Sequence, residues 1–144
     1  MRKSASRLCS VLVSGMVFVT LASAAFCESI TAKAIYDATG VKGGLVVHVG
    51  CGDAKLTAAL RADDSYLVQG LDTDAARIAE TRKSLHAAGL YGPVTVNQFD
   101  GKHLPYVKDM VTLVVAEKLG DVTMDEVRRV LAPDGVAYIA KGGK

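Results

Sequence analysis

Five short apolar runs alternate with segments of helical periodicity along most of this 144-residue chain. Each run is nearly continuous in apolar residues, a pattern typical of strands that are buried on both faces of a parallel sheet. The runs cover residues 45–49, 66–71, 94–99, 110–116 and 136–140. Because helical connections between strands of one sheet form right-handed crossovers, the alternation predicts a doubly wound, mostly parallel five-stranded α/β sheet with strand order 3-2-1-4-5.

Helical segments are predicted before and between these runs by their spacing and their end signals. They cover residues 30–38, 53–62, 74–88 and 123–131. Gly40 and Gly89 follow two of them, at the position where a left-handed residue ends a helix. Thr123 and Glu126 have the spacing of a capping box, in which each side chain bonds the other's backbone amide. The expected apolar face of the third helix consists of Ala75, Ile78, Ala79 and Leu85.

An export signal is predicted over residues 1–25, with the folded domain over 26–144. Three cationic residues near the start precede an apolar run over 8–26, and the small residues 22–25 offer a cleavage site. The alternative is an uncleaved membrane anchor, because the apolar run is close to the roughly 17-residue minimum for a spanning helix. We therefore expect a protein exported to the periplasm or the extracellular space, or anchored in the membrane through this segment alone.

The charge of the chain beyond this segment is close to zero, since 14 of the 17 basic residues remain against 15 acidic ones. No run rich in lysine and arginine remains there, so no dedicated nucleic-acid surface is expected. One of the three cysteines lies in the predicted signal. The other two do not indicate a disulfide framework, and we expect no metal site.

Polar residues at strand ends indicate where a ligand would bind, because open parallel sheets bind ligands at the carboxyl ends of their strands. Gly50 and Gly52 follow the first strand, where glycine allows a tight turn and the close approach of a ligand. Asp72 ends the second strand, 22 positions after Gly50. An acid about 20 residues after such a glycine can accept hydrogen bonds from both ribose hydroxyls of a nucleoside. We therefore favour a ribose contact for Asp72 over the alternative of a helix N-cap.

Asp100 ends the third strand and leaves two interpretations open. Its carboxylate can accept a hydrogen bond from an exocyclic amine while a neighbouring amide contacts the ring nitrogen, or it can form an Asx-turn with Gly101. A nicotinamide oxidoreductase would share the glycine loop and Asp72. However, the motif G-x-G-x-x-G needs a third glycine, and Lys55 occupies that position.

Four segments carry the motifs of the chain. They read LVVHVGCGDAKLTAAL, YLVQGLDTDAARIAETRKSL, VTVNQFDGKHLPYVKDMVTLVVAE and DEVRRVLAPDGVAYIA. Taken in order, they resemble the successive motifs of class I S-adenosylmethionine-dependent methyltransferases, especially the broad type 11 group. The resemblance implies a Rossmann-like fold with S-adenosylmethionine as a small-molecule cofactor. The cofactor-binding residues that it implies are Gly50, Cys51, Gly52, Asp72, Thr73, Asp100 and Gly101. In the family pattern, Gly50 and Gly52 border the methionine part and Asp72 holds the ribose. Asp100 and Gly101 contact the adenine.

Two side chains and the C-terminal end depart from the family pattern. His48 stands where the family has an acid, and we interpret it as a buried, hydrogen-bonded core residue. Ala54 replaces a third glycine. The family's sheet normally continues with two further strands, so the last two strands of the full methyltransferase fold are expected to be lacking. Any association is then expected at the edge of the fifth strand or through a missing C-terminal segment.

The predicted function is a methyltransferase-like domain that uses S-adenosylmethionine, with an unknown acceptor and no assigned catalytic residue. The alternative is a non-catalytic nucleoside-binding or scaffold module of an exported protein. Export, the missing strands and His48 favour this alternative, and a resemblance to the methyltransferase-like head segments of exported quinoprotein-type β-propeller proteins would favour it too. Glu117 and His103 lie in loops near the predicted site and are interpreted as solvated positions.

Overall fold

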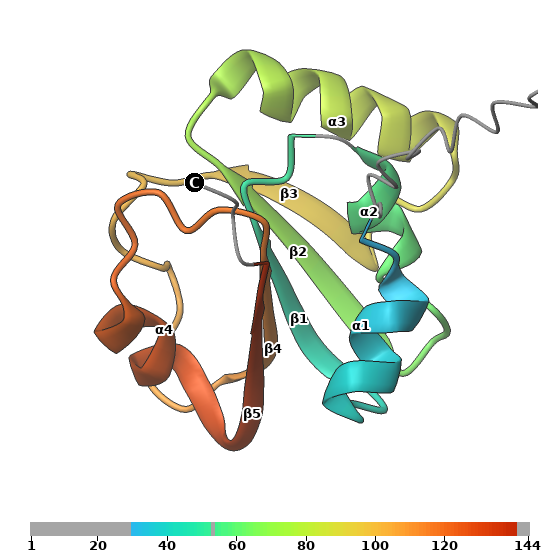
Figure 1. The fold of residues 1–144 in the computed structure, drawn as a ribbon. Helices are drawn as coiled ribbons and strands as arrows, with labels where there is room; N and C mark the ends of the chain where they lie inside the picture. The colour runs from blue at the N-terminus through green and yellow to red at the C-terminus, as the bar shows by residue number, and fades with distance from the viewer. Residues whose placement is uncertain (1–29, 53, 141–144) are drawn as a thin grey trace, which may run out of the picture.

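The predicted strand order is confirmed, because the five strands form one sheet in the order β3-β2-β1-β4-β5 with all four neighbouring pairs parallel. The computed structural model describes residues 30–52 and 54–140. The strands are β1 (Gly44–Val49), β2 (Tyr66–Asp72), β3 (Val94–Gln98), β4 (Val111–Ala116) and β5 (Leu131–Ile139). The helices are α1 (Ala32–Thr39), α2 (Ala54–Ala59), α3 (Ala75–Ala87) and α4 (Met124–Val130) (Figure 1).

The predicted signal over residues 1–25 lies outside the described residues. Among the helices that the structure does describe, none has the length and apolar character to cross a membrane.

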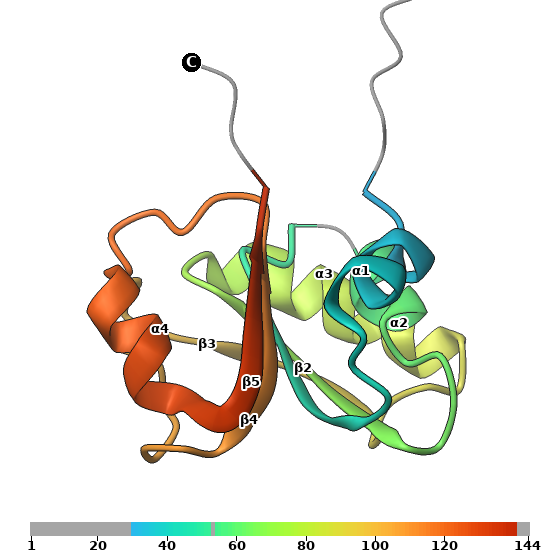
Figure 2. The same cartoon turned by 60° about the horizontal axis from the view of Figure 1, so that its bottom comes forward.

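Helices pack on both faces of the sheet, as a doubly wound topology requires. α1, α2 and α3 lie on one face and α4 lies on the other (Figures 1 and 2). In β1, Val46 belongs to the apolar cluster under the first three helices, whereas Val47 belongs to the cluster on the face of α4. Both valines are fully buried. Burial on both faces explains why the strands appear in the sequence as unbroken apolar runs.

Most helix ends follow their sequence signals. Gly40 ends α1 in the left-handed conformation, with φ of 70°, and Gly89 has φ of 68° just after α3. Asp74 is the N-cap of α3. The second helix is shorter than the predicted range 53–62. The buried residues of α3 are Ile78, Thr81 and Leu85, so the prediction of Ala75 and Ala79 on this face is wrong. Thr81 was missed because a periodicity of apolar residues does not detect a buried residue that carries a hydroxyl.

The capping box of α4 forms only in part. The Thr123 hydroxyl accepts a hydrogen bond from the Glu126 N–H at 3.2 Å, as predicted. The Glu126 carboxylate does not return to Thr123. It accepts from the Leu104 N–H at 2.8 Å and from the Arg129 guanidinium at 2.6 and 2.8 Å. A tertiary contact with the loop after β3 has therefore replaced the local one.

This environment predicts a pH dependence of stability. Hydrogen bonds from Arg129, followed by the Leu104 amide, lower the pKa of Glu126 from its ordinary value of 4.5 to about 2, against the opposing effect of burial. A carboxyl whose folded pKa is depressed stabilises the protein above its unfolded pKa and loses that contribution as the pH falls through the folded value. Urea unfolding of the wild type and of Glu126→Gln is therefore expected to give a stability difference that is constant above about pH 5 and shrinks from pH 4.5 towards pH 2. A difference that does not change with pH would contradict this.

β5 begins at Leu131, five residues before the predicted start of the strand at 136. Leu131 pairs with Val111 and Val136 pairs with Leu113, and the register shifts between the two pairs. The predicted turn at 133–135 is thus an irregularity within the strand. Glycine is required there because a Cβ on Gly135 would lie 2.8 Å from the carbonyl oxygen of Val111.

Candidate cofactor-binding site

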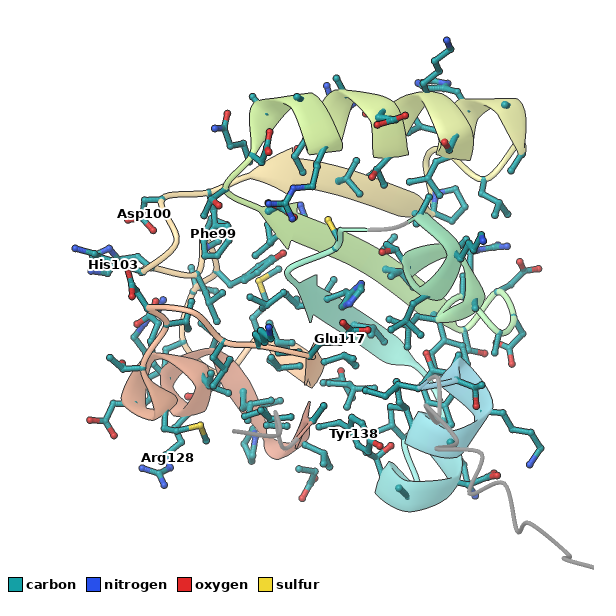
Figure 3. All side chains as sticks on the ribbon, turned by 45° about the horizontal axis from the view of Figure 1, so that its top comes forward. Phe99, Asp100, His103, Glu117, Arg128 and Tyr138 are labelled. Carbon is teal, nitrogen blue, oxygen red and sulfur yellow. The ribbon has the colours of Figure 1, made fainter. Side chains whose placement is uncertain are left out.

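The carboxyl ends of β1, β2, β3 and β4 surround a cleft of about 420 Å³, which we call the nucleoside cleft. Its volume lies within the range of ligand pockets. Figure 3 shows Phe99 and Asp100 towards one side of the molecule and Glu117 nearer its middle. Of the seven residues predicted to bind a cofactor, five line the nucleoside cleft, namely Gly50, Asp72, Thr73, Asp100 and Gly101.

The glycine loop after β1 uses its backbone amides internally. Gly50 has φ of 78°, a conformation that favours glycine. The N–H groups of Gly50 and Cys51 donate to the carbonyl oxygen of Leu71 at 2.8 and 3.2 Å, and the N–H of Gly52 donates to the Gly50 carbonyl at 2.7 Å. A pyrophosphate binds such loops through their amides. These three amides are already engaged, so the loop offers a ligand close approach to its backbone rather than a phosphate cradle.

The side chain of Cys51 points into the core. It is 1% exposed and belongs to the apolar cluster under α1, α2 and α3. Burial, with a smaller effect from the charge of Asp72, raises the pKa of its thiol to about 11. A Cβ on Gly70 would lie 2.9 Å from the Cys51 sulfur, which explains the glycine within β2. The Cys51 side chain therefore packs against the sheet, and a contact of the Cys51 backbone with the cofactor stays a prediction.

Asp72 presents a buried carboxylate to the nucleoside cleft. Its side chain is 4% exposed. Its Oδ1 accepts from the Asp74 N–H at 2.9 Å, and its Oδ2 lies 3.4 Å from Arg77 Nη1. Asp74 is the N-cap of α3, accepting from two amides of the first turn, so that role does not fall to Asp72. Because a carboxylate has about four acceptor positions, Asp72 keeps capacity for further donors.

Asp100 forms an Asx-turn, one of the two interpretations that the sequence left open. Its Oδ1 accepts from the N–H groups of Lys102 and His103 at 2.8 and 2.7 Å, and its Oδ2 lies 2.7 Å from His103 Nδ1. These bonds, led by the one from the His103 amide, hold the pKa of Asp100 well below its usual range. The turn therefore places an ionised and partly exposed carboxylate at the rim of the cleft.

The loops that follow β2 and β3 are tied to each other. Gln98 Nε2 donates to the Thr73 carbonyl oxygen at 2.9 Å, and the Phe99 N–H donates to the Asp72 carbonyl oxygen at 3.1 Å. Gly101 has φ of 83°, and a Cβ there would lie 3.0 Å from the Thr73 methyl group. These contacts fix the spacing between the predicted ribose and adenine positions.

Further residues line the nucleoside cleft. The loop 118–121 belongs to the segment after the fourth strand, where the strand-end rule directs attention, whereas Val49, Arg77 and Phe99 were not singled out from the sequence. Arg77 lies three residues after the N-cap Asp74, and its Nε is 3.3 Å from that carboxylate. A helical side chain leans towards the N-terminus of its helix, which was the available signal for Arg77. Phe99 and the loop directly follow β3 and β4, where the strand-end rule predicts ligand contacts.

A second cleft of about 510 Å³ adjoins the nucleoside cleft at Gly50, which lines both. Its walls come from the start of α1, the glycine loop, α2 and the residue after β4. His48 at this cleft is buried, and its Nδ1 lies 2.8 Å from Thr57 Oγ1, which confirms the prediction of a hydrogen-bonded core histidine. Glu117 and His103 are exposed, as predicted. Glu117 lines the second cleft and His103 contacts Asp100.

The strand order, the glycine loop after β1 and the acids after β2 and β3 define a Rossmann-like α/β domain. The chain belongs to the methyltransferase domain family, whose model matches residues 46–135. Among curated proteins, none matches the sequence significantly. The family resemblance is thereby confirmed, whereas the relation to β-propeller head segments stays a prediction.

Solved structures with the same fold carry different chemistry. The geranyl diphosphate C-methyltransferase of Streptomyces coelicolor, solved with Mg²⁺, geranyl diphosphate and S-adenosylhomocysteine, is 20% identical with a TM-score of 0.66. The glycopeptide N-methyltransferase MtfA is 22% identical with a TM-score of 0.62. The cyclase SpnF is 22% identical with a TM-score of 0.67. These likenesses show the fold, and the name of the third illustrates that the fold alone does not fix the reaction.

The match covers most of this chain and a smaller part of those structures. It includes 74–75% of this chain but 42% of the geranyl diphosphate enzyme, 50% of MtfA and 42% of SpnF. The chain therefore spans half the length, or less, of these structures.

Proposed function

We propose that this chain binds S-adenosylmethionine and transfers its methyl group to an acceptor. One observation carries the proposal: the glycine loop, Asp72 and the turn at 100–101 meet around one cleft in a domain of the methyltransferase family. The structure of the geranyl diphosphate enzyme with S-adenosylhomocysteine supports it by analogy.

The residues around the nucleoside cleft suit an adenosine. The buried Asp72 has acceptor positions for the two ribose hydroxyls. The loop carrying Asp100 and Gly101 lies at a distance fixed by its contacts with Thr73, so an adenine beside the ribose would meet this loop. The ring of Phe99 adds an aromatic surface to the same cleft, which suits the face of a base.

The methionine part would extend from the nucleoside cleft as far as Gly50, where the second cleft begins. Since the amides of residues 50–52 are engaged within the protein, the loop favours a ligand without phosphates over a dinucleotide. When bound, the cofactor supplies a methyl group already activated by its sulfonium. The residues of the chain then mainly have to align the acceptor and exclude water.

Calorimetric titration of the full chain with S-adenosylmethionine, S-adenosylhomocysteine and NAD tests this proposal. We expect micromolar dissociation constants for the first two ligands and no measurable heat with NAD, because its pyrophosphate finds no free amides at residues 50–52. Circular dichroism controls for folding. A folded chain that binds none of the three would favour the non-catalytic scaffold, and binding of NAD alone would favour a nicotinamide-binding domain.

We also propose that residues 1–25 act as an export signal. The support is the cationic start, the apolar run and the small residues at its end. Expressed with its own N-terminus in a Gram-negative bacterium, the chain is expected in the periplasm with a mass lowered by the loss of this segment. Recovery of the full mass from the cytosol would contradict it.

A further inference from the structure

The second cleft combines apolar walls with one acid at a strand end. Its apolar walls come from Ile30 just before α1, from Ala32 at the start of α1, and from Leu56 and Ala59 of α2. Surfaces of this kind bind the hydrocarbon or aromatic part of a ligand, while a few polar groups fix its orientation.

Glu117 is placed to be such a polar group. It follows Ala116, which pairs in register with Val49, so Glu117 stands beside Gly50 at the ends of two neighbouring strands. The closeness of these loops is also seen at Gly50, where a Cβ would lie 3.7 Å from the Lys118 carbonyl oxygen. Within the described part of the chain, no residue forms a hydrogen bond or an ion pair with the Glu117 carboxylate.

The other titratable groups of this cleft differ in kind. His48 is tied to α2 by the contact of its Nδ1 with Thr57 Oγ1. Lys55, in the first turn of α2, brings a cation that would attract an anionic group. Glu117 is therefore the acid of the cleft among the described lining residues. An ionised carboxylate only accepts hydrogen bonds, so it selects a ligand group that carries N–H or O–H.

We propose that the second cleft binds the methyl acceptor and that this acceptor is an amine on an apolar body, held by an N–H···O bond to Glu117. This inference rests on the proposed function, because it assigns the substrate class to the cleft that adjoins the cofactor at Gly50. A carboxylate bonds N–H groups of either a neutral or a protonated amine, and the bonds to a charged partner are the stronger ones.

The transfer step balances without a further reactant, and an amine that binds in its protonated form first loses one proton to solvent. The lone pair of the neutral amine nitrogen forms a bond to the methyl carbon while the bond from that carbon to sulfur breaks, and the electron pair of that bond leaves with the sulfur as a thioether. The nitrogen becomes positively charged and releases a proton. The Glu117 carboxylate accepts this proton and passes it to solvent. In this step Glu117 orients the nitrogen and takes up its proton.

The test uses the full chain saturated with S-adenosylhomocysteine, whose binding is first established by calorimetry. Hexylamine, hexanol and hexanoate are then compared as probes that share one apolar body and differ in head group. We expect hexylamine to bind about tenfold or more tightly than hexanol. Glu117→Gln is expected to remove this preference when the probes are compared on the variant saturated with S-adenosylhomocysteine, as its own titration establishes. Asp134→Asn, which removes an exposed acid in the turn within β5, is the matched control and is expected to keep the preference.

Each contrary result has a separate meaning. Equal binding of the three probes, tighter binding of hexanoate, or hexylamine binding that Glu117→Gln does not change would overturn the amine proposal while the cofactor proposal stands. A chain that fails to bind S-adenosylhomocysteine would overturn the proposed function, and the acceptor proposal with it.

Discussion

Replacing Asp72 with alanine is expected to weaken the binding of S-adenosylhomocysteine by about 1.5 to 3 kcal/mol, the range for hydrogen bonds to a charged group. That loss corresponds to roughly 10- to 150-fold in dissociation constant. The reason is that Asp72 presents a carboxylate with 4% side-chain exposure, fixed by the Asp74 N–H and by Arg77, at the place proposed for the ribose. Calorimetry measures the effect directly.

Asp74→Asn is the matched control, because it removes one negative charge two residues away. Asparagine remains a good N-cap, so α3 is expected to keep its start and the affinity for the ligand is expected to stay close to the wild-type value. If Asp72→Ala binds as tightly as the wild type, Asp72 does not hold the ribose. An equal loss in both variants would instead indicate an effect of charge alone.

Replacing Arg129 with methionine is expected to lower the urea midpoint of unfolding well below that of the wild type. Its guanidinium donates to the carbonyl oxygens of Tyr106 and Leu104 at 2.9 and 3.0 Å. It also forms a bidentate ion pair with the Glu126 carboxylate. Methionine keeps an apolar stem of similar length but leaves Glu126, with 13% of its side chain exposed, without this partner. The Arg129 side chain is 38% exposed, so the loss of stability is expected to be smaller than for a fully buried ion pair.

Arg128→Met provides the control in the next residue of α4. The Arg128 side chain extends away from the sheet (Figure 3) and pairs with Asp125 at 3.2 Å on an exposed surface. Such pairs contribute about 0 to 1 kcal/mol, so this variant is expected to unfold near the wild-type urea midpoint. Equal midpoints for the two variants would show that Arg129 does not anchor the loop after β3.

The sequence predicted those parts of the structure that depend on local patterns. Continuous apolar runs such as 45–49 identified the strands, because the sheet buries both faces of each. The strand-end rule placed Asp72 and Gly101 beside one cleft although they come from different loops. The interpretation of His48 as a hydrogen-bonded core residue is confirmed, since it is buried and its Nδ1 lies 2.8 Å from Thr57 Oγ1.

Contacts between residues far apart in the chain could not be predicted from local sequence patterns. The Glu126 side chain bonds Leu104, 22 residues earlier in the chain, and no local spacing reveals this partner. No local pattern reveals that the Cys51 side chain packs against β2, where Gly70 leaves room for its sulfur. The engagement of the loop amides by Leu71 likewise depends on strand pairing, and it bears most directly on which ligand the loop accepts.

The crystal structure of the chain with S-adenosylhomocysteine would test the central claim most directly. We expect the adenosine in the nucleoside cleft, with both ribose hydroxyls bonded to the Asp72 carboxylate and the adenine beside the loop of Asp100 and Gly101. A ligand bound elsewhere, or an Asp72 carboxylate that still contacts only Arg77 and the Asp74 amide in the complex, would contradict it.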